Sequence, residues 1–334
     1  MSATAPSAAP QQLLVGMSAA ARTLVRQIDC AAASDAKVLI TGESGSGKEI
    51  AARLIHARGA RRRGSFVSVN CVGLPESLLE GELFGHVRGS FTGAFRDRDG
   101  LLRVAHGGTA LLDEVSEMSL RMQALLLRFL ETGEIQPVGG LTTPVLDVRV
   151  VATTHRSLKR MVEQGAFRED LFYRLNVVEI SVPALRERIE DVPLLARHFI
   201  DHICGEYQLP QPVVSPEAFE ALKDYRWPGN IRELRNTIER TIVCHRGGIL
   251  RAFELPKART PLKARSAPLP PVAESLFDRI ARKGESFWHV AYEPFIRRDL
   301  TREQMRELVV LGLEATCGSY KLVADLFGIA PIDY

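Results

Sequence analysis

A glycine-rich loop near the N-terminus has the composition and spacing of a phosphate-binding site. It fits GxxxxGK, and the apolar run KVLIT precedes it while a helical pattern, EIAARLIHA, follows. Glycines let backbone N–H groups turn toward a phosphate, the helix N-terminus adds partial positive charge, and Lys48 can reach the β and γ phosphates of a nucleotide. Because strand, loop and helix follow in the required order, we favour this function over a chance match in a flexible loop. The predicted nucleotide-binding residues here are Gly42, Glu43, Ser44, Gly45, Ser46, Gly47, Lys48 and Glu49.

An acidic pair at the end of an apolar run supplies the second half of a hydrolytic site. In TALLDE, Asp113 would hold Mg²⁺, directly or through water, and Glu114 would polarise the attacking water. Such a pair is commonly just solvated, but beside the phosphate loop it indicates hydrolysis rather than binding alone. The pattern therefore predicts ATP and Mg²⁺ as the nucleotide and the metal ion.

Three arginines in later segments are candidates for contact with the γ-phosphate. Arg168 and Arg174 lie in FREDLFYRLN, where either could simply form a surface ion pair with a neighbouring acid. The alternative is an arginine finger, which stabilises charge on the transferring phosphoryl group and typically gives about 10³ to 10⁵ in rate. A finger supplied by a neighbouring copy requires a ring. In WPGNIRELRN, Arg232 begins a helix from which it could reach a γ-phosphate.

The elements that must position these residues alternate along the first half of the chain. Apolar runs at 37–41, 65–71, 109–114 and 148–154 predict strands, and SLRMQALLLRFLETG between the last two has helical spacing. This order predicts a parallel sheet with helices on both faces. After VPALRERIEDVP only helical patterns remain, including one with Ser215 as N-cap, and they predict a smaller helical domain.

Composition narrows the class of protein without identifying a partner. The chain has 334 residues and a formal net charge of +3, too weakly basic to establish nucleic-acid binding. No apolar run approaches the ~18 residues of a membrane span, and the start MSATAPSAAPQQ lacks the pattern of a signal peptide. The five cysteines form no CxxC pair, which favours free thiols. We therefore expect a cytoplasmic protein with no membrane partner.

Several blocks together resemble one protein family. GESGSGKE, GGTALLDEVSEM, LLRFLETGEIQPVGG, FREDLFYRLN and WPGNIRELRN are similar to blocks of the AAA+ transcriptional activators of bacterial sigma-54 RNA polymerase, the enhancer-binding proteins. The resemblance runs from about Leu14 to Cys244, and in the family a Glu follows the loop lysine, as Glu49 does here. It implies an α/β AAA+ P-loop NTPase fold with a parallel sheet flanked by helices, a small helical lid domain and a helix-turn-helix-like C-terminus.

With this resemblance the chain divides into five predicted segments. They are a disordered tail at 1–12, the AAA+ α/β ATPase domain at 13–185, the helical lid at 186–250, a proline-rich linker at 251–285, and an incomplete or diverged Fis-type helix-turn-helix region at 286–334. Only about a dozen residues precede Leu14, so no receiver domain is expected ahead of the ATPase. GSYKLVADLFGIAP resembles the first part of the helix-turn-helix, and the sequence ends before most of a reading helix.

The stretch RGSFTGAF resembles the family's GAFTGA loop, which contacts the sigma factor. The match places Ser90 where the family has Ala. By resemblance, Phe91, Thr92 and Gly93 would touch the sigma factor, and the loop would rise and fall with the state of the nucleotide. An exposed aromatic on a glycine-hinged loop is a poor core residue and a suitable anchor for another protein.

The resemblance also assigns roles around the nucleotide. Asn70 would pair with Glu114 and sense the γ-phosphate, while Arg168 and Arg174 would act on a neighbouring subunit and Arg232 as a sensor. In the block ATTHRSL, Thr154 matches the family's first sensor. Beside it the family usually has Asn where this chain has His155.

The predicted function is therefore an ATP-hydrolysing activator, in a hexameric or similar ring, that remodels the closed complex of sigma-54 polymerase through the GSFTGA loop. DNA at enhancer-like sites is a further expected partner, although no DNA-binding residues are identified. One alternative is an AAA+-derived DNA-binding regulator that acts without sigma-54, but such a protein would be expected to lose the FTGA segment. A general AAA+ remodelling ATPase is the other alternative, and those proteins use differently placed pore loops.

Overall fold

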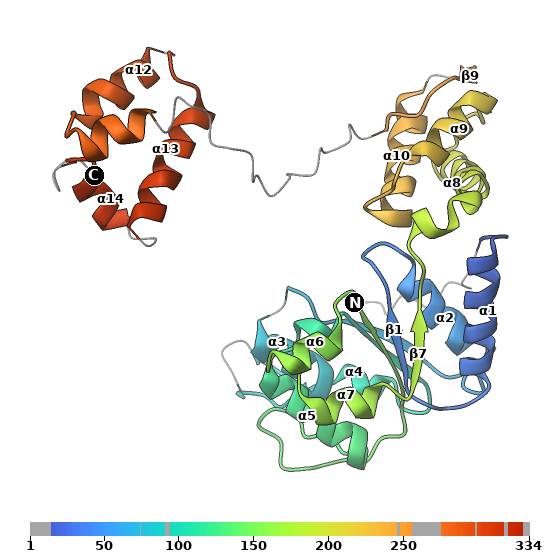
Figure 1. Ribbon diagram of the computed structural model, residues 1–334. Coiled ribbons are helices and arrows are strands. Elements are labelled where there is room, and N and C mark those ends of the chain that lie inside the picture. The colour runs from blue at the N-terminus through green and yellow to red at the C-terminus, as the bar shows by residue number, and fades with distance from the viewer. Residues whose placement is uncertain are drawn as a thin grey trace. The chain divides into compact units, whose positions relative to one another are not determined.

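A computed structural model describes residues 15–73, 75–90, 94–245, 248–255, 275–297, 299–316 and 320–329. The chain divides into two compact units, residues 1–256 and 257–334. The first unit contains a β-sheet covered by helices, followed by a bundle of three helices (Figure 1). The elements of the second unit, among its described residues, are all helical.

The main sheet of the first unit is parallel and has the strand order β2-β5-β6-β1-β7. Its strands are β1 (Val38–Thr41), β2 (Phe66–Asn70), β5 (Thr109–Asp113), β6 (Arg149–Thr154) and β7 (Val178–Ser181). The four apolar runs predicted as strands are confirmed, whereas β7 was not predicted because its run is short and directly follows a helix. Since β5, β6 and β1 are neighbours, the residues that follow them meet at one edge of the sheet.

Successive side chains of the central strands enter two separate cores. On β1, Val38 and Ile40 join one core while Leu39 joins the other, and on β6 Val151 and Ala152 divide in the same way. This alternation follows from the period of two in a β-strand. Because both faces are buried, the strands read as continuous apolar runs rather than as alternating ones.

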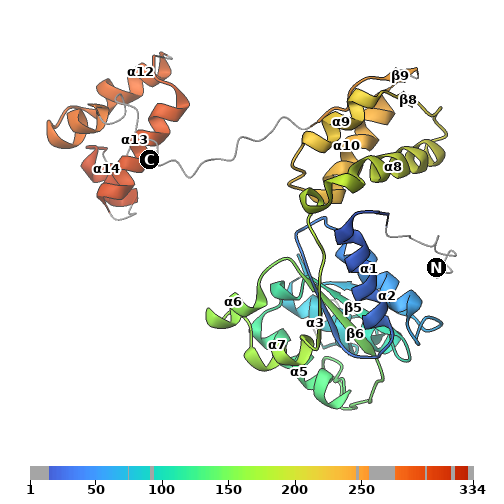
Figure 2. The same ribbon diagram turned by 45° about the vertical axis from the view of Figure 1, so that its right-hand side comes forward.

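Helices cover both faces of the sheet (Figure 2). One core is closed by α1 (Ala19–Ala32) and α2 (Lys48–Arg58), which pack on each other. The other core is closed by the remaining helices of this domain, α3 (Glu76–Phe84), α4 (Leu101–Val104), α5 (Leu120–Thr132), α6 (Leu158–Glu163) and α7 (Glu169–Leu175). The predicted helix in SLRMQALLLRFLETG is α5, which Ser119 caps by accepting a hydrogen bond from the Met122 N–H.

A short antiparallel pair lies between β2 and β5 in the sequence. It joins β3 (Gly85–His86) to β4 (Arg98–Asp99), and the segment between the two strands carries the RGSFTGAF stretch. Since β2 and β5 are neighbours in the sheet, with Asn70 opposite Asp113, this insertion starts and ends on adjacent strands.

The helical lid follows a 3₁₀ segment at Leu185–Asp191. Its helices are α8 (Val192–Glu206), α9 (Pro216–Asp224) and α10 (Asn230–Cys244), with a small parallel pair formed by β8 (Val213–Val214) and β9 (Ile249–Leu250). Trp227 is fully buried among them, and Ser215 caps α9 as predicted. The lid core also contains Phe253, so it extends beyond residue 250, where the linker was predicted to begin.

The second unit has its own small core. Its helical segments are two π-helical turns at Asp278–Arg282 and Trp288–Tyr292, α12 (Glu293–Ile296), α13 (Arg302–Ala315) and α14 (Tyr320–Leu326). The linker prediction for 251–285 is wrong at its C-terminal end, because Leu276 and Ile280 pack in this core. Leu276 and Ile280 are four residues apart, an ordinary helical spacing, but they belong to a short segment that directly follows a proline-rich stretch of the sequence. Within the described ranges, no helix is long and apolar enough to cross a membrane.

Candidate active site

The phosphate loop connects β1 to α2 in the conformation that its glycines permit. Gly42, Gly45 and Gly47 have φ values of 152°, 75° and 105°, and Lys48 is the first residue of α2. A Cβ at Gly45 would lie 2.5 Å from the carbonyl oxygen of Gly229 in the lid, so a side chain is excluded there by both space and φ. The loop is therefore shaped by its glycines and closely approached by the lid.

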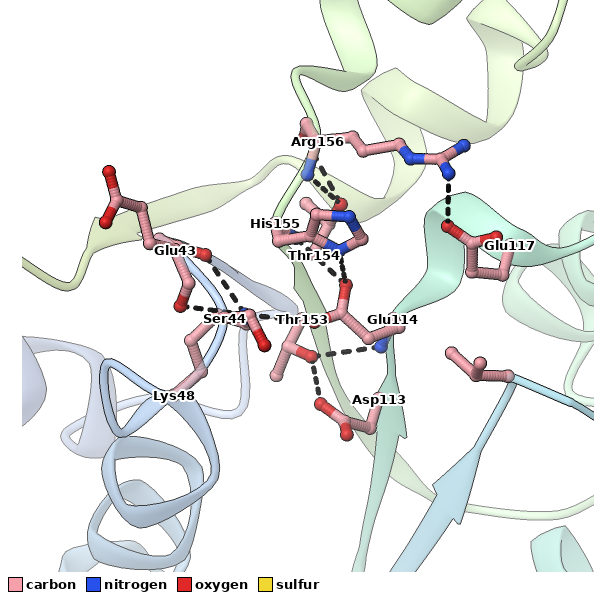
Figure 3. Close-up of polar contacts among 12 residues, drawn as sticks. Glu43, Ser44, Lys48, Asp113, Glu114, Glu117, Thr153, Thr154, His155 and Arg156 are labelled. Atoms are coloured by element: carbon pink, nitrogen blue, oxygen red, sulfur yellow. Dashed lines mark hydrogen bonds and ion pairs between the residues drawn. The ribbon is translucent and has the colours of Figure 1, made fainter. Parts of the chain in front are cut away.

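Lys48 and Glu114 meet at the carboxyl edge of the sheet. Lys48 is 6% exposed, and its Nζ lies 3.0 Å from Glu114 Oε1 and donates to the Gly42 carbonyl at 3.0 Å. Glu114 follows β5 with φ 59° and ψ 55°, a left-handed conformation that is uncommon outside glycine and that turns its side chain toward the loop (Figure 3). The structure thus brings together the predicted phosphate-binding lysine and the predicted base.

The second oxygen of Glu114 is held by His155. Glu114 Oε2 accepts from the backbone N–H of His155 at 2.9 Å and lies 2.6 Å from its Nδ1 (Figure 3). Burial alone would raise the pKa of Glu114, but the hydrogen bonds from His155 and Lys48 outweigh it and hold the pKa below its usual value. The carboxylate is therefore ionised at neutral pH, and since it can only accept, Nδ1 carries the proton.

Threonines at the end of β6 fix the acidic pair and the turn that follows. Thr153 donates its hydroxyl to Asp113 Oδ1 and accepts from the Glu114 N–H at 3.1 Å. The hydroxyl of Thr154, a predicted sensor, exchanges hydrogen bonds with the backbone of Arg156, and Arg156 pairs with Glu117. In this structure Thr154 therefore shapes the turn that carries His155.

Asn70 does not make the contact expected of it. Its Oδ1 accepts from the Val72 N–H at 2.9 Å, while the partners of the Glu114 carboxylate among the described residues are Lys48 and His155. Asn70 stands opposite Asp113 in the β2–β5 register, so it lies at the same edge of the sheet. Its side chain closes a local turn there.

Glu49 also differs from expectation. Its carboxylate accepts two hydrogen bonds from Arg53, one turn further along α2, and both side chains are exposed. This arrangement is an ordinary i,i+4 ion pair on a helix surface. The carboxylate of Glu49 therefore faces Arg53.

The lid forms hydrogen bonds and an ion pair with the phosphate loop through Arg186 and Asn230, which were not predicted as site residues. Arg186 makes a two-pronged ion pair with Glu43, with both N–O distances 2.8 Å. Asn230, fully buried with φ 53°, donates to Glu43 and to the Ser44 carbonyl, and accepts from the Leu185 N–H. The signal that could have found Asn230 is its place in the WPGN turn before a helix, although its side chain does not cap that helix.

Two further lid arginines reach the same loop. Arg188, which is buried, donates to the Ser46 carbonyl at 2.8 Å. Arg232 donates to the Ser44 hydroxyl at 3.1 Å. The predicted sensor arginine therefore lies beside the phosphate loop, and Arg188 lies with it.

Among the described residues, the side-chain partners of Arg168 and Arg174 lie away from the phosphate loop. Arg168, just before α7, is 42% exposed and pairs with Asp170 at 2.7 Å. Arg174, on α7, donates to the Leu130 carbonyl. Burial and the nearby charge of Arg174 lower the pKa of Lys37. Because Lys37 precedes β1 while the phosphate loop follows it, Arg174 lies toward the opposite edge of the sheet.

A cavity of about 780 Å³ extends beside the phosphate loop toward α7. Gly42 and His155 line it, and α7 contributes Phe172 and Tyr173. Within the described part of the chain, neither arginine of α7 is among the lining residues. The structure therefore brings α7 to the neighbourhood of the loop without bringing Arg168 or Arg174 into the cavity.

The residues predicted to contact the sigma factor, Phe91, Thr92 and Gly93, lie outside the described residues. The base of their loop is described. The Gly89 N–H donates to the Ala94 carbonyl at 2.8 Å, and the Arg88 N–H donates to Asp97 at 2.7 Å. One backbone–backbone bond and one backbone–carboxylate bond therefore join the two sides of the base of this loop.

Comparison with known proteins identifies the parts of this chain. Residues 14–181 match the family model of the Sigma-54 interaction domain, and residues 186–283 match that of the AAA+ ATPase lid domain. The chain is 44% identical over 304 residues to the regulatory protein AtoC of Escherichia coli, covering 90% of this chain and 65% of AtoC. It is 42% identical over 333 residues to the DNA-binding transcriptional regulator NtrC of Azospirillum brasilense, covering 98% of this chain and 69% of NtrC.

A solved structure has the same architecture. NtrX from Brucella abortus in complex with ATP superimposes with a TM-score of 0.66 at 36% identity, covering 90% of this chain and 69% of NtrX. The chain thus spans about two thirds of the length of these relatives. Its phosphate loop, acidic pair and lid contacts all lie within the matched segments, and the chain belongs to the family of AAA+ proteins with a Sigma-54 interaction domain and an AAA+ lid.

Proposed function

We propose that this chain hydrolyses ATP and uses the hydrolysis to remodel a sigma-54 RNA polymerase complex. The observation that carries the proposal is the 3.0 Å contact between Lys48 and Glu114. It places the predicted phosphate-binding lysine against an ionised carboxylate. An ion pair on the protein surface would be solvated, whereas the side chains of Lys48 and Glu114 are both largely buried. NtrX, a relative of the same fold, has been solved in complex with ATP and with ADP.

In this proposal Lys48 leaves Glu114 for the β and γ phosphates of the bound nucleotide. Glu114 then accepts a proton from the attacking water, which a carboxylate can do only while ionised. Its hydrogen bonds to His155 keep it ionised and oriented. Asn70, beside Asp113 on the neighbouring strand, would approach the γ-phosphate side when nucleotide is bound.

The residues present also fit a magnesium ion carried with the nucleotide. Asp113 ends β5 beside Glu114, and among the described residues no group of three or more His, Cys, Asp and Glu could form a metal site from protein alone. Mg²⁺ is commonly held by one or two carboxylates together with substrate phosphates, so a single aspartate suits it. Asp113 would hold the ion, which neutralises charge on the phosphates when bound. The Ser46 hydroxyl, buried without a hydrogen-bond partner in the described structure, is suited to a phosphate oxygen.

The lid contacts support a link between nucleotide state and domain position. Glu43 and the backbone of Ser44 and Ser46 bond to Arg186, Asn230 and Arg188, all beyond residue 184. A nucleotide that changes the loop would therefore pull on the lid. Arg232, now on the Ser44 hydroxyl, would move to the γ-phosphate as a sensor.

Assembly into a ring is part of the proposal. In the part of the chain that the structure describes, Arg168 pairs with Asp170 and Arg174 with the Leu130 carbonyl, and neither arginine lines the cavity beside the phosphate loop. A neighbouring copy in a hexamer or similar ring would use them as arginine fingers. Specific ATPase activity should then rise with protein concentration, whereas a constant specific activity across the assembly range would contradict shared sites.

Contact with sigma-54 is proposed for Phe91, Thr92 and Gly93. Their loop grows from the β3–β4 pair, which is inserted between β2 and β5, and β5 ends at Asp113. The segment that carries the loop is thus connected at both ends to the two strands whose ends carry Asn70 and Asp113. We expect Phe91→Ala to hydrolyse ATP at close to the parent rate but to form no open complex in a sigma-54 transcription assay. Normal transcription by this variant would remove the proposed role of the loop.

Binding to enhancer-like DNA is proposed for the C-terminal unit, by its resemblance to a helix-turn-helix. Val323 and Phe327 of its last segment pack in the core of this unit, and Gly328 has φ 66°, which suits a turn after a helix. A gel-shift assay with fragments upstream of a sigma-54 promoter tests this part separately. Acting on RNA polymerase, such a protein would work in the cytoplasm.

A further inference from the structure

The two oxygens of the Glu114 carboxylate have different partners. Oε1 lies 3.0 Å from the Nζ of Lys48. Oε2 accepts from the backbone N–H of His155 at 2.9 Å and lies 2.6 Å from the Nδ1 of the same residue (Figure 3). The two oxygens of the carboxylate are therefore held differently. Oε1 contacts the long, flexible side chain of Lys48, whereas Oε2 accepts from two donors of His155.

A bound nucleotide would affect the Lys48 contact and the His155 contact of Glu114 differently. Lys48 belongs to the phosphate loop, so its ammonium group would turn from Oε1 to the phosphates when ATP binds. His155 belongs to the turn after β6, where the Thr154 hydroxyl bonds the Arg156 backbone and the Glu114 N–H bonds Thr153. None of these contacts involves the phosphate loop. Binding would thus free Oε1 and leave Oε2 held.

We infer that His155 is a positioning residue for hydrolysis: its imidazole holds Oε2 of Glu114 so that Oε1 is the oxygen that accepts the proton from the attacking water. The inference rests on the proposed ATPase function. It gives His155 the task of orienting Glu114, which the sequence had assigned to Asn70. In this structure Asn70 bonds the backbone of Val72 instead.

The imidazole adds something that the backbone donor cannot. A single hydrogen bond to Oε2 leaves the carboxylate free to rotate about that contact, whereas a second donor on the same oxygen fixes its plane. His155 is 38% exposed, and the hydrogen bond described for its ring is the one to Glu114. An asparagine at this position would place an amide N–H the same number of bonds from the backbone as Nδ1. The role therefore depends on a donor rather than on a ring.

The test compares kcat and KM for ATP in the full chain and in three variants. We expect His155→Ala to lower kcat about tenfold while KM and the affinity for a non-hydrolysable ATP analogue change by less than about twofold, because orientation and not binding is lost. His155→Asn should recover kcat to within about threefold of the parent, since its amide can donate to Oε2. His155→Asp should fall below His155→Ala, because two carboxylates would repel.

A neighbouring residue provides the matched control. Arg160 is exposed in α6, a few residues beyond His155, does not line the cavity beside the phosphate loop, and makes no contact with Glu114 among the described interactions. Arg160→Ala should keep kcat within about twofold of the parent. A parental kcat in His155→Ala, or an asparagine variant no better than alanine, overturns the inference while leaving the ATPase proposal intact. A parent chain that does not hydrolyse ATP overturns the proposed function, and this inference with it.

Discussion

Glu114 and Arg168 both carry charges that the proposed hydrolysis needs, but one chain holds them in opposite ways. Glu114 is 15% exposed, follows a buried strand and is bonded by Lys48 and His155. Arg168 is 42% exposed, stands at the N-terminus of α7 and pairs with Asp170, two residues away. The carboxylate half of the proposed site is thus assembled within a single chain, whereas the proposed arginine half is exposed on its surface.

This difference suggests a division of the proposed site: folding of one chain positions Glu114, whereas assembly with a second chain would supply Arg168. The contacts of Glu114 with Lys48 and His155 in one chain lower its pKa and orient its carboxylate before any nucleotide arrives. An exposed arginine with only a surface partner is held weakly and can exchange that partner for a phosphate. Hydrolysis would then wait for the neighbouring copy, which couples the chemistry to ring formation.

The largest effect is expected from Arg168→Ala. Loss of an arginine finger should lower kcat by about 10³ to 10⁵, with nucleotide affinity little changed, because the finger acts on charge that develops in the transition state. Single-turnover and steady-state hydrolysis assays would measure it. Parental kcat in this variant would show that Arg168 is only a surface ion-pair partner.

Mixing two inactive variants tests whether the finger acts between chains. Arg168→Ala supplies an intact Glu114, and Glu114→Gln supplies an intact Arg168. If the two halves come from different copies, mixed rings contain some complete sites and recover part of the activity. No recovery at any mixing ratio, with mixed rings confirmed by mass, would place both residues in the same chain's site.

Glu114→Gln is the next largest change. Glutamine keeps the shape and can still accept from His155, but it cannot take a proton, so kcat should fall by about 10² to 10⁴. ATP binding should persist, because Lys48 and the glycine loop are intact. An equilibrium binding titration beside the hydrolysis assay distinguishes the two effects, and a variant that hydrolyses like the parent would mean that another group activates the water.

The sequence was sufficient to predict most of the carboxylate half. GxxxxGK after an apolar run fixes strand, loop and helix together, and the buried strand before Asp113 brings the acidic pair to the same edge. Four of the five main-sheet strands followed from continuous apolar runs. Spacing could not predict which side chain contacts Glu114, since Asn70 ends one strand beside β5 and His155 directly follows the other. Only the directions of the side chains separate them.

The lid contacts were beyond the reach of local patterns for a different reason. Arg186 bonds Glu43, 143 residues earlier in the chain, and Asn230 bonds the same carboxylate across 187 residues. An arginine in LRERIED and an asparagine in WPGN look like a surface charge and a helix cap. Their role appears only when the lid folds against the loop.

The reactivity of Cys71, a buried cysteine near Asp113 and Glu114, measures how often this edge of the sheet opens to solvent. Cys71 is 3% exposed, and burial, with the nearby charges of Asp113 and Glu114, raises the pKa of its thiol to about 12. Since the thiolate is the reactive form, alkylation of Cys71 at pH 8 should be at least about a hundredfold slower than that of exposed Cys30. Peptide mapping by mass spectrometry after timed labelling measures both rates. Equal rates would show that this edge of the sheet opens readily.

The smallest effect is expected from a change to Asp170, the ion-pair partner of Arg168 in the same chain. Asp170 accepts two hydrogen bonds from Arg168 and one from the Leu171 N–H, and its side chain is 47% exposed. Asp170→Asn keeps an acceptor for Leu171 and removes only the charge of an exposed ion pair, so the unfolding temperature should stay within about 2 °C. If the functional partner of Arg168 is the neighbour's phosphate, as proposed, kcat should also remain within about twofold. If Asp170→Asn instead lost as much activity as Arg168→Ala, the local pair would be what orients the arginine, and the outward half of the site would be built within one chain after all.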